Sequence, residues 1–273
     1  METHQIGSLS SFIEFVNSIK PSSGNFGYMH WFRSECQSHS KTQLVPGIFR
    51  EYISGPSSTV EFYKKENSIT SLFQIEAYPH LTQHNLVDHI VGTQFLMQHY
   101  GAETRFLDWT ENALISLFFA VENIKSDYDS NIWILDPFSL NSETRKTYSG
   151  LSVDEFVLYP SLKPIADVNN YFNNDMISVK DNTIRYPIAM KPFYIDDRMK
   201  NQNACFTLFG FEAKGLTEHP TSHKFLKKIV IPRKQFRMIK RELFKIGVSY
   251  DTIYPGLEGI SKKCNYAFNE YFV

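Results

Sequence analysis

Apolar residues recur at helical spacing in several parts of this chain of 273 residues. Residues 8–20 show the pattern first, and residues 85–100 show it more clearly, with Gly101 placed where a left-handed C-terminal cap belongs. A continuous apolar run then covers residues 113–121 and predicts a buried helix. Further helices are expected over 59–78 (as two short helices), 233–246 and 259–272.

Short runs of apolar and aromatic residues predict strands between these helices. Residues 141–182 are polar and weakly periodic, which indicates a loop-rich insertion. Residues 184–195 contain two prolines and are expected to be extended or to form an edge strand. Because helices and strands alternate irregularly, we predict an α+β fold, a single domain with a mixed, irregular sheet flanked by helices. The remaining predicted strands are 26–33, 131–135, 204–211 and 228–231.

The segment that joins the two central helices is polar. We interpret it as a loop, and loops held between rigid elements are where functional side chains concentrate. Asp108 or Thr110 is expected to cap the helix that follows. Between residues 99 and 110 the candidate functional residues are His99, Tyr100, Thr104, Arg105, Asp108 and Trp109.

Composition and charge exclude several classes of protein. The formal net charge is −1, so no basic surface for bulk nucleic acid is required. Aromatic residues make up 15%, which indicates a core of large rings or a pocket that stacks planar ligands. The three cysteines lie far apart, which argues against a disulfide scaffold and for a reducing compartment. With no signal peptide and no apolar run long enough to span a bilayer, we expect a cytoplasmic protein without a membrane partner.

The common motifs of enzyme chemistry are absent from the sequence. It contains no glycine-rich phosphate loop, no Gly-x-Ser-x-Gly nucleophile turn, and neither the histidine nor the paired-cysteine spacing of metal sites. We therefore expect no metal cofactor. What remains is a set of arginines beside aromatic residues.

Three groups of residues resemble the FRG-domain family. Trp31-Phe32-Arg33 is similar to the Phe-Arg-Gly signature for which the family is named. Gln98-His99-Tyr100-Gly101, followed by Thr104-Arg105-Phe106-Leu107-Asp108-Trp109-Thr110, is similar to a second signature, in which a Gln-His-aromatic-Gly step leads into Thr-Arg-Leu-Leu-Asp-Trp-Thr. Phe118-Phe119-Ala120 matches the end of the apolar helix that follows in the family.

The resemblance continues more weakly to about residue 263. Arg198, Gln202 and Phe206 are similar to a later Arg…Gln…Phe element of the family. Ser34 departs from the pattern, since the family has Gly there. Together with the helical pattern at each end of the chain, the resemblance divides it into an N-terminal helix in residues 1–25, an FRG-type domain over 26–263 and a C-terminal helix end over 264–273. Because the family occurs in bacterial and phage genomes, it also implies a defence or toxin-type role, by association only.

Each candidate side chain has a functional and a structural interpretation. Arg33, at the end of an aromatic strand, suits bidentate capture of a phosphate or carboxylate, or an ion pair with a carboxylate such as Asp108. For Arg105 a structural ion pair is the favoured interpretation, and for Asp108 it is a helix cap. Trp109 is typical of a core residue, and His99 is suited to the negative end of a helix or to a structural hydrogen bond.

One enzyme hypothesis orders these residues by analogy with the ADP-ribosyltransferase fold. In it Arg33 pairs with the pyrophosphate of NAD, which would be the substrate. The segment from Thr104 to the apolar helix lies under the nicotinamide, where an aromatic residue stacks. Gln202, or less favourably Glu212, orients the ribose while nicotinamide leaves. The catalytic residues predicted in this way are Arg33, Thr104 and Gln202, and the acceptor is a protein or nucleic acid.

Two other hypotheses remain open. A binding or regulatory module would recognise a small anionic nucleotide, a modified peptide or a phage component without turnover. Its pocket would use Arg33, His99, Tyr100, Arg105, Asp108 and Trp109. Alternatively, the polar residues form a buried network that determines the fold.

Overall fold

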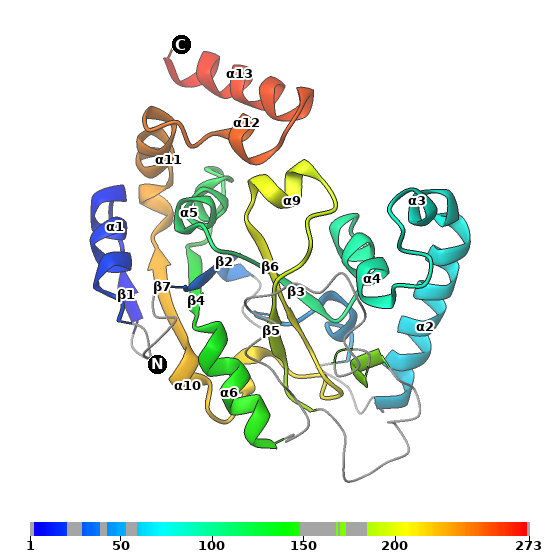
Figure 1. The fold of residues 1–273 in the computed structure, drawn as a ribbon. Coiled ribbons are helices and arrows are strands. Elements are labelled where there is room, and N and C mark those ends of the chain that lie inside the picture. The colour runs from blue at the N-terminus through cyan, green and yellow to red at the C-terminus, as the bar shows by residue number, and fades with distance from the viewer. Residues whose placement is uncertain are drawn as a thin grey trace.

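The computed structural model describes residues 3–20, 29–38, 43–52, 59–147, 168, 170–172 and 185–271. Its centre is one open sheet of seven strands in the order β1-β7-β4-β2-β3-β6-β5 (Figure 1). Strands β1 and β7 are parallel and all other neighbours are antiparallel, which confirms the predicted α+β fold with a mixed sheet. The strands are β1 (Thr3–Gln5), β2 (Trp31–Cys36), β3 (Phe106–Thr110), β4 (Ser130–Leu135), β5 (Ile188–Met190), β6 (Ala204–Leu208) and β7 (Leu226–Ile231).

Helices cover both faces of the sheet (Figure 1). Helices α1, α5 and α11 bury their apolar residues on one face, and α2, α4 and α6 bury theirs on the other. The α-helices are α1 (Leu9–Ser18), α2 (Thr59–Glu76), α3 (Tyr78–Gln83), α4 (Ile90–His99), α5 (Ala113–Val121), α6 (Pro137–Thr147), α9 (Asp197–Asn201), α10 (Ser222–Phe225), α11 (Phe236–Lys245), α12 (Tyr250–Ile253) and α13 (Leu257–Tyr271). Short 3-10 helices are η2 (Gly47–Phe49), η3 (Asn170–Phe172), η5 (Leu216–Glu218) and η6 (Arg233–Gln235).

Strand β4 explains why the sheet needs cover on both faces. Successive side chains of a strand point to opposite faces. Trp133 and Leu135 accordingly join the core beneath α2, α4 and α6, while Ile132 and Ile134 join the core beneath α1, α5 and α11. Every residue of β4 is buried, so the continuous apolar run predicted over 131–135 is a central strand.

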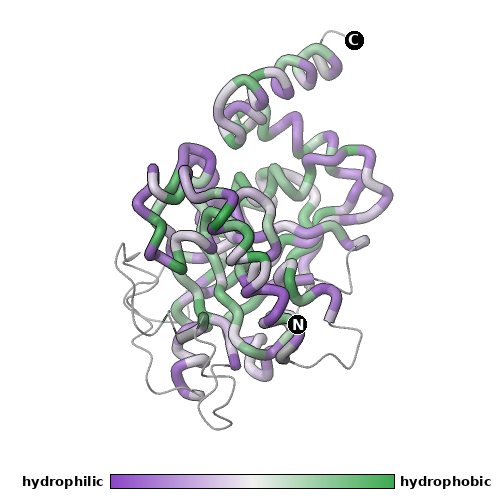
Figure 2. The backbone as a smooth tube through the Cα atoms, turned by 90° about the vertical axis from the view of Figure 1, so that its right-hand side faces the viewer, coloured by the Kyte–Doolittle hydropathy of each residue, from purple (hydrophilic) through white to green (hydrophobic). Residues whose placement is uncertain are grey.

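The hydropathy of the chain follows this layering. Figure 2 shows hydrophobic stretches concentrated in the body of the molecule and mixed colours along the C-terminal helix, which extends away from it. No described helix combines the length and the hydrophobicity that a membrane span requires.

Several predicted boundaries are confirmed and others shift. Gly101 ends α4 with a φ of +85°, and Gly247 follows α11 with a φ of +87°, as left-handed caps do. Residues 59–76 form one helix, so the predicted division at this point is wrong, and α3 follows it separately. Residues 188–190 form the edge strand expected within 184–195. Most of the predicted insertion at 141–182 lies outside the described residues, and its first residues belong to α6.

The prediction of a loop between the two central helices is wrong. Residues 106–110 form β3, which pairs with β6 along its whole length, nearly a hundred residues away in sequence. The helix cap is also different, because Asp108 and Thr110 lie inside the strand. The side chain of Asn112 caps α5, with Oδ1 accepting from the backbone N–H groups of Leu114 at 3.0 Å and Ile115 at 3.3 Å.

We predict that Asn112→Ala lowers the free energy of unfolding by about 1 kcal/mol, because two N–H groups at the start of α5 lose their acceptor. Asn112→Asp keeps an acceptor oxygen and is the matched control, with a change of less than about 0.5 kcal/mol. Urea denaturation of the variants measures both values. Equal losses in the two variants would contradict the assignment of the cap.

Candidate functional site

A cleft opens where β2 and β3 diverge. The two strands share a single register pair, Phe32 with Thr110, whereas β2 pairs with β4 over all six of its residues. The gap between them forms a cleft of about 560 Å³, closed by α5 on one side and α9 on another. Its lining residues are Phe32, Arg33, Ser34, Gln98, His99, Gly101, Asp108, Trp109, Thr110, Ser116, Phe119, Arg198, Met199, Gln202, Ala204 and Phe206.

Arg33 lies at the mouth of this divergence and bonds to both strands. Residues two apart on a strand share a face, so Glu35 lies beside Arg33 and accepts from its Nε at 2.9 Å. Nη1 donates to the backbone oxygen of Asp108 at 2.8 Å and lies 3.8 Å from Oδ2 of the same residue. The predicted pairing of Arg33 with Asp108 is therefore present, together with a stronger one to Glu35. Nη2 makes no hydrogen bond with a described residue.

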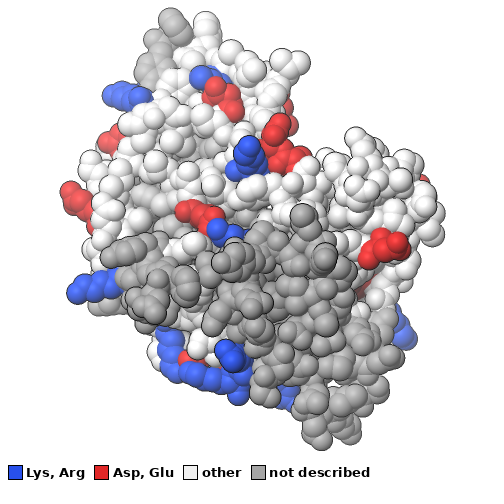
Figure 3. Space-filling view, viewed as in Figure 1, with Lys and Arg blue, Asp and Glu red and all other residues white. Residues whose placement is uncertain are grey.

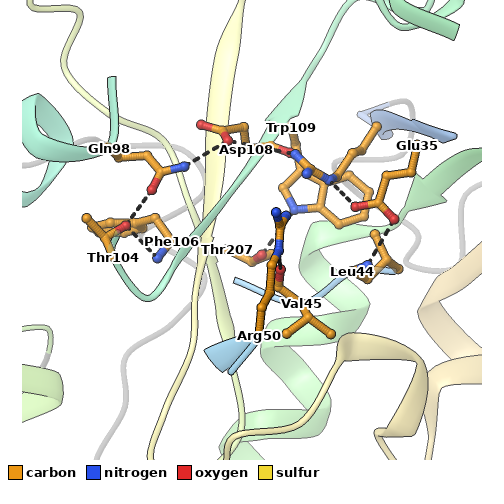
Figure 4. Close-up of polar contacts among 11 residues, drawn as sticks. Glu35, Leu44, Val45, Arg50, Gln98, Thr104, Phe106, Asp108, Trp109 and Thr207 are labelled. Carbon is orange, nitrogen blue, oxygen red and sulfur yellow. Dashed lines mark hydrogen bonds and ion pairs between the residues drawn. The ribbon is translucent and has the colours of Figure 1, made fainter. Parts of the chain in front are cut away.

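Asp108 is the exposed residue in the middle of an otherwise buried strand. Its side chain is 53% exposed, because β2 no longer covers β3 at this point. Figure 4 shows Gln98 between Asp108 and Thr104. Gln98 Nε2 donates to Asp108 Oδ2 at 2.8 Å, and Thr104 Oγ1 lies 2.5 Å from Gln98 Oε1. Helix α4 and the start of β3 thus hold this carboxylate together.

His99 is the last residue of α4 and lines the cleft. Its Nε2 is 2.5 Å from Asp196 Oδ2. Asp196 is the N-cap of α9 and accepts from the backbone N–H of Met199 at 2.9 Å with its other oxygen. His99 therefore joins α4 to α9 while it lines the cleft.

Helix α9 and its C-cap supply Arg198 and Gln202, which are four residues apart. The guanidinium of Arg198 lies 5.4 Å from the centre of the Tyr254 ring. Gln202 Nε2 donates to the backbone oxygen of Ile253 at 3.4 Å, and the Gln202 backbone oxygen accepts from Thr110 Oγ1 at 2.6 Å. The element resembling Arg…Gln…Phe thus contributes all three of its residues to the cleft.

Arg105 lies outside the cleft and is fully buried. Nε donates to Glu66 Oε1 at 2.8 Å, and the two terminal nitrogens donate to the backbone oxygens of Phe209 and Tyr171. Burial disfavours the charged guanidinium, but the attraction of Glu66, Tyr63 and Tyr171 and the hydrogen bond to Glu66 together outweigh it, so the pKa of Arg105 is raised. Arg105 contacts protein groups on every side, and the predicted ligand contact finds no support in this geometry.

The other predicted residues divide between core and surface. Thr104 is buried, and Trp109 is buried but also lines the cleft, with its ring N–H donating to Thr207 Oγ1 at 3.0 Å. Tyr100 is 71% exposed and is not among the lining residues. Glu212, the alternative to Gln202, lies in a separate hollow and pairs with Lys214.

Gln98, Ser116 and Phe119 are among the lining residues that the sequence did not predict as site residues. Gln98 precedes the predicted His99, and its motif position was the available signal. Ser116 and Phe119 belong to the apolar run of α5, where nothing in the sequence distinguishes them from core residues. The Ser116 hydroxyl is buried and makes no hydrogen bond with a described residue.

The charged residues among those that line the cleft have both signs, Arg33 and Arg198 being basic and Asp108 acidic. Figure 3 shows basic and acidic side chains interspersed over the described part of the face seen in Figure 1. Within the described residues, no group of three or more His, Cys, Asp or Glu side chains lies close enough together to hold a metal ion.

Comparison with known proteins gives one family. The model of the FRG domain matches residues 29–129, which include β2, α4, β3 and α5. No curated protein and no solved structure gives a significant match to the chain.

We predict that Arg105→Ala destabilises the protein by about 3–5 kcal/mol, because Glu66 is left buried without its partner. The double variant Arg105→Ala with Glu66→Ala should recover part of that loss. Guanidinium denaturation of the single and double variants measures the coupling. Additive losses would show that the pair contributes no coupling to stability.

Proposed function

The chain contains an FRG domain, and we propose that this domain binds an anionic nucleotide in the cleft between β2 and β3. NAD is the leading candidate. The observation that carries the proposal is the divergence of the two strands, which leaves a preformed cleft with Arg33 at its edge. Ligand sites of small molecules are clefts of about 300–1,000 Å³, and this one is in that range.

The side chains of the cleft match the chemistry of a dinucleotide. A guanidinium held in place by Glu35 loses little entropy when it pairs with a phosphate. Arg198 adds a second cation from α9. The rings of Phe32, Phe119 and Phe206 contribute apolar walls on which a nicotinamide or adenine can pack.

The proposed reaction breaks the bond between nicotinamide and ribose. The ADP-ribosyl group then passes to water, as NAD hydrolysis, or to a protein or nucleic-acid acceptor. Loss of NAD or modification of an essential target stops cell growth, and so we extend the proposal to a defence or toxin-type effector in bacteria or phage. The support for that extension is association with the FRG family alone.

A binding module without turnover is the second candidate. It is favoured by the bonds that Arg33 and Gln202 already make within the protein, Arg33 to Glu35 and Asp108 and Gln202 to Ile253. Groups held in this way suit rigid recognition as well as catalysis. Such a module would bind NAD or another nucleotide and release no product.

We predict that the purified protein releases nicotinamide from NAD and gains thermal stability when NAD is added. Arg33→Ala should remove the thermal shift and lower the release ~100-fold or more, because the pyrophosphate loses its cation. Arg33→Lys keeps the charge without the fork geometry and should fall between the two. Nicotinamide chromatography and thermal melting measure both effects.

The matched control is Arg233→Ala, which removes a half-exposed arginine paired with Asp127 outside the cleft. It should change neither readout. A thermal shift without nicotinamide release would favour the binding module. A folded wild-type protein with neither signal would refute the NAD proposal.

A further inference from the structure

Asp108 lines two neighbouring cavities. Among the described residues that line the cleft, it is the only one with a carboxylate. It also lines a neighbouring hollow of about 270 Å³, together with Arg33, Gln98 and Gly101. Figure 4 shows Arg50, whose Nε donates to the Val45 oxygen at 3.3 Å and which lines that second hollow. A ligand in the cleft and a second molecule in the hollow would therefore reach the same carboxylate.

The hydrogen bonds around Gln98 run in one direction. The backbone N–H of Phe106 donates to Thr104 Oγ1 at 3.1 Å, so the Thr104 hydroxyl hydrogen is available to donate to Gln98 Oε1 at 2.5 Å. This assigns the oxygen and nitrogen of the Gln98 amide. Its Nε2 then donates to Asp108 Oδ2 at 2.8 Å, and Oδ1 makes no hydrogen bond with a described residue. The chain leaves one carboxylate oxygen committed and the other available.

We propose that Asp108 is the catalytic carboxylate of the cleft and that Gln98 is the residue that positions it. This inference rests on the proposed cleavage of NAD. The negative charge that acts in catalysis is then the Asp108 carboxylate on β3. Gln202, whose neutral amide already donates to the Ile253 backbone oxygen, contacts the ligand. Arg33 stays on the phosphate side, since Glu35 is its closer partner.

The chemistry requires a carboxylate at this place. When the bond between the ribose C1′ and the nicotinamide nitrogen breaks, the electron pair leaves with nicotinamide, which becomes neutral. Positive charge then develops on C1′ and the ring oxygen of the ribose, and a fixed carboxylate stabilises such an oxocarbenium-like state. Water or an acceptor hydroxyl in the second hollow adds to C1′, and its proton passes to Asp108.

The test compares wild-type protein with Asp108→Asn and Gln98→Met, two substitutions of similar shape. Asp108→Asn removes the charge and keeps an oxygen for Gln98, so kcat for nicotinamide release should fall ~100-fold or more while KM for NAD and the thermal shift with NAD stay within about threefold and a few degrees of wild type. Gln98→Met leaves the carboxylate in place without its amide donor, and kcat should fall ~10-fold at unchanged KM.

The double variant separates a positioning role from a structural one. If Gln98 acts through Asp108, Gln98→Met should change kcat little in the Asp108→Asn background. A purely structural Gln98 would lower the melting temperature in both backgrounds and leave kcat per folded molecule unchanged. The control Glu111→Gln removes an acid that pairs with Lys191 outside the cleft, and it should match wild type.

The outcomes distinguish this inference from the proposed function. Wild-type release of nicotinamide with an equally active Asp108→Asn would overturn the inference and leave NAD cleavage standing. Equal effects of Gln98→Met in both backgrounds would overturn the positioning role. A wild-type protein that binds NAD without releasing nicotinamide would refute both the reaction and the catalytic carboxylate.

Discussion

The guanidinium of Arg33 crosses the gap between β2 and β3 at the point where their backbones stop pairing. A sheet that opens in its middle leaves backbone groups without ladder partners, and these groups bond to other donors or acceptors instead. Nη1 of Arg33 donates to the Asp108 oxygen and so supplies a side-chain bond in place of the missing ladder. The same guanidinium is anchored by Glu35, whose second oxygen accepts from the Leu44 backbone N–H at 3.0 Å. One side chain therefore joins β2 to β3 across the cleft, beside the single register pair that the two strands share.

The other half of this arrangement is the start of β3. Arg105 precedes the strand and is buried against Glu66 of α2, and its backbone oxygen accepts from the Phe209 N–H at 3.0 Å. These bonds hold β3 to α2 and to the segment after β6, away from β2. Three residues later the strand presents Asp108 to the cleft. Within a few residues the chain thus places a buried structural arginine just before β3 and an exposed acid in the middle of the strand.

Helices α4 and α9 complete the cleft through polar pairs between elements distant in sequence. Gln98 and His99 are neighbours at the end of α4, yet one contacts Asp108 on β3 and the other contacts Asp196 at the start of α9. A helix end can serve two directions because consecutive residues lie about 100° apart around its axis. The short loop that follows Gly101 then returns the chain into β3.

The sequence alone determined the helices with clear apolar periodicity, the left-handed glycine at 101 and the buried strand β4. It also determined the similarity of residues 29–129 to the FRG domain. All of these depend on residues close together in the chain. The sequence could not show that residues 106–110 form a strand, since that strand exists by pairing with β6, and no local pattern encodes a partner so distant. Nor could the sequence show that Arg105 and Asp108, two charged residues of one motif, have different surroundings. Only the tertiary structure brings Glu66 to the first and leaves the second open to the cleft, because burial and charge pairing are decided by which elements pack together.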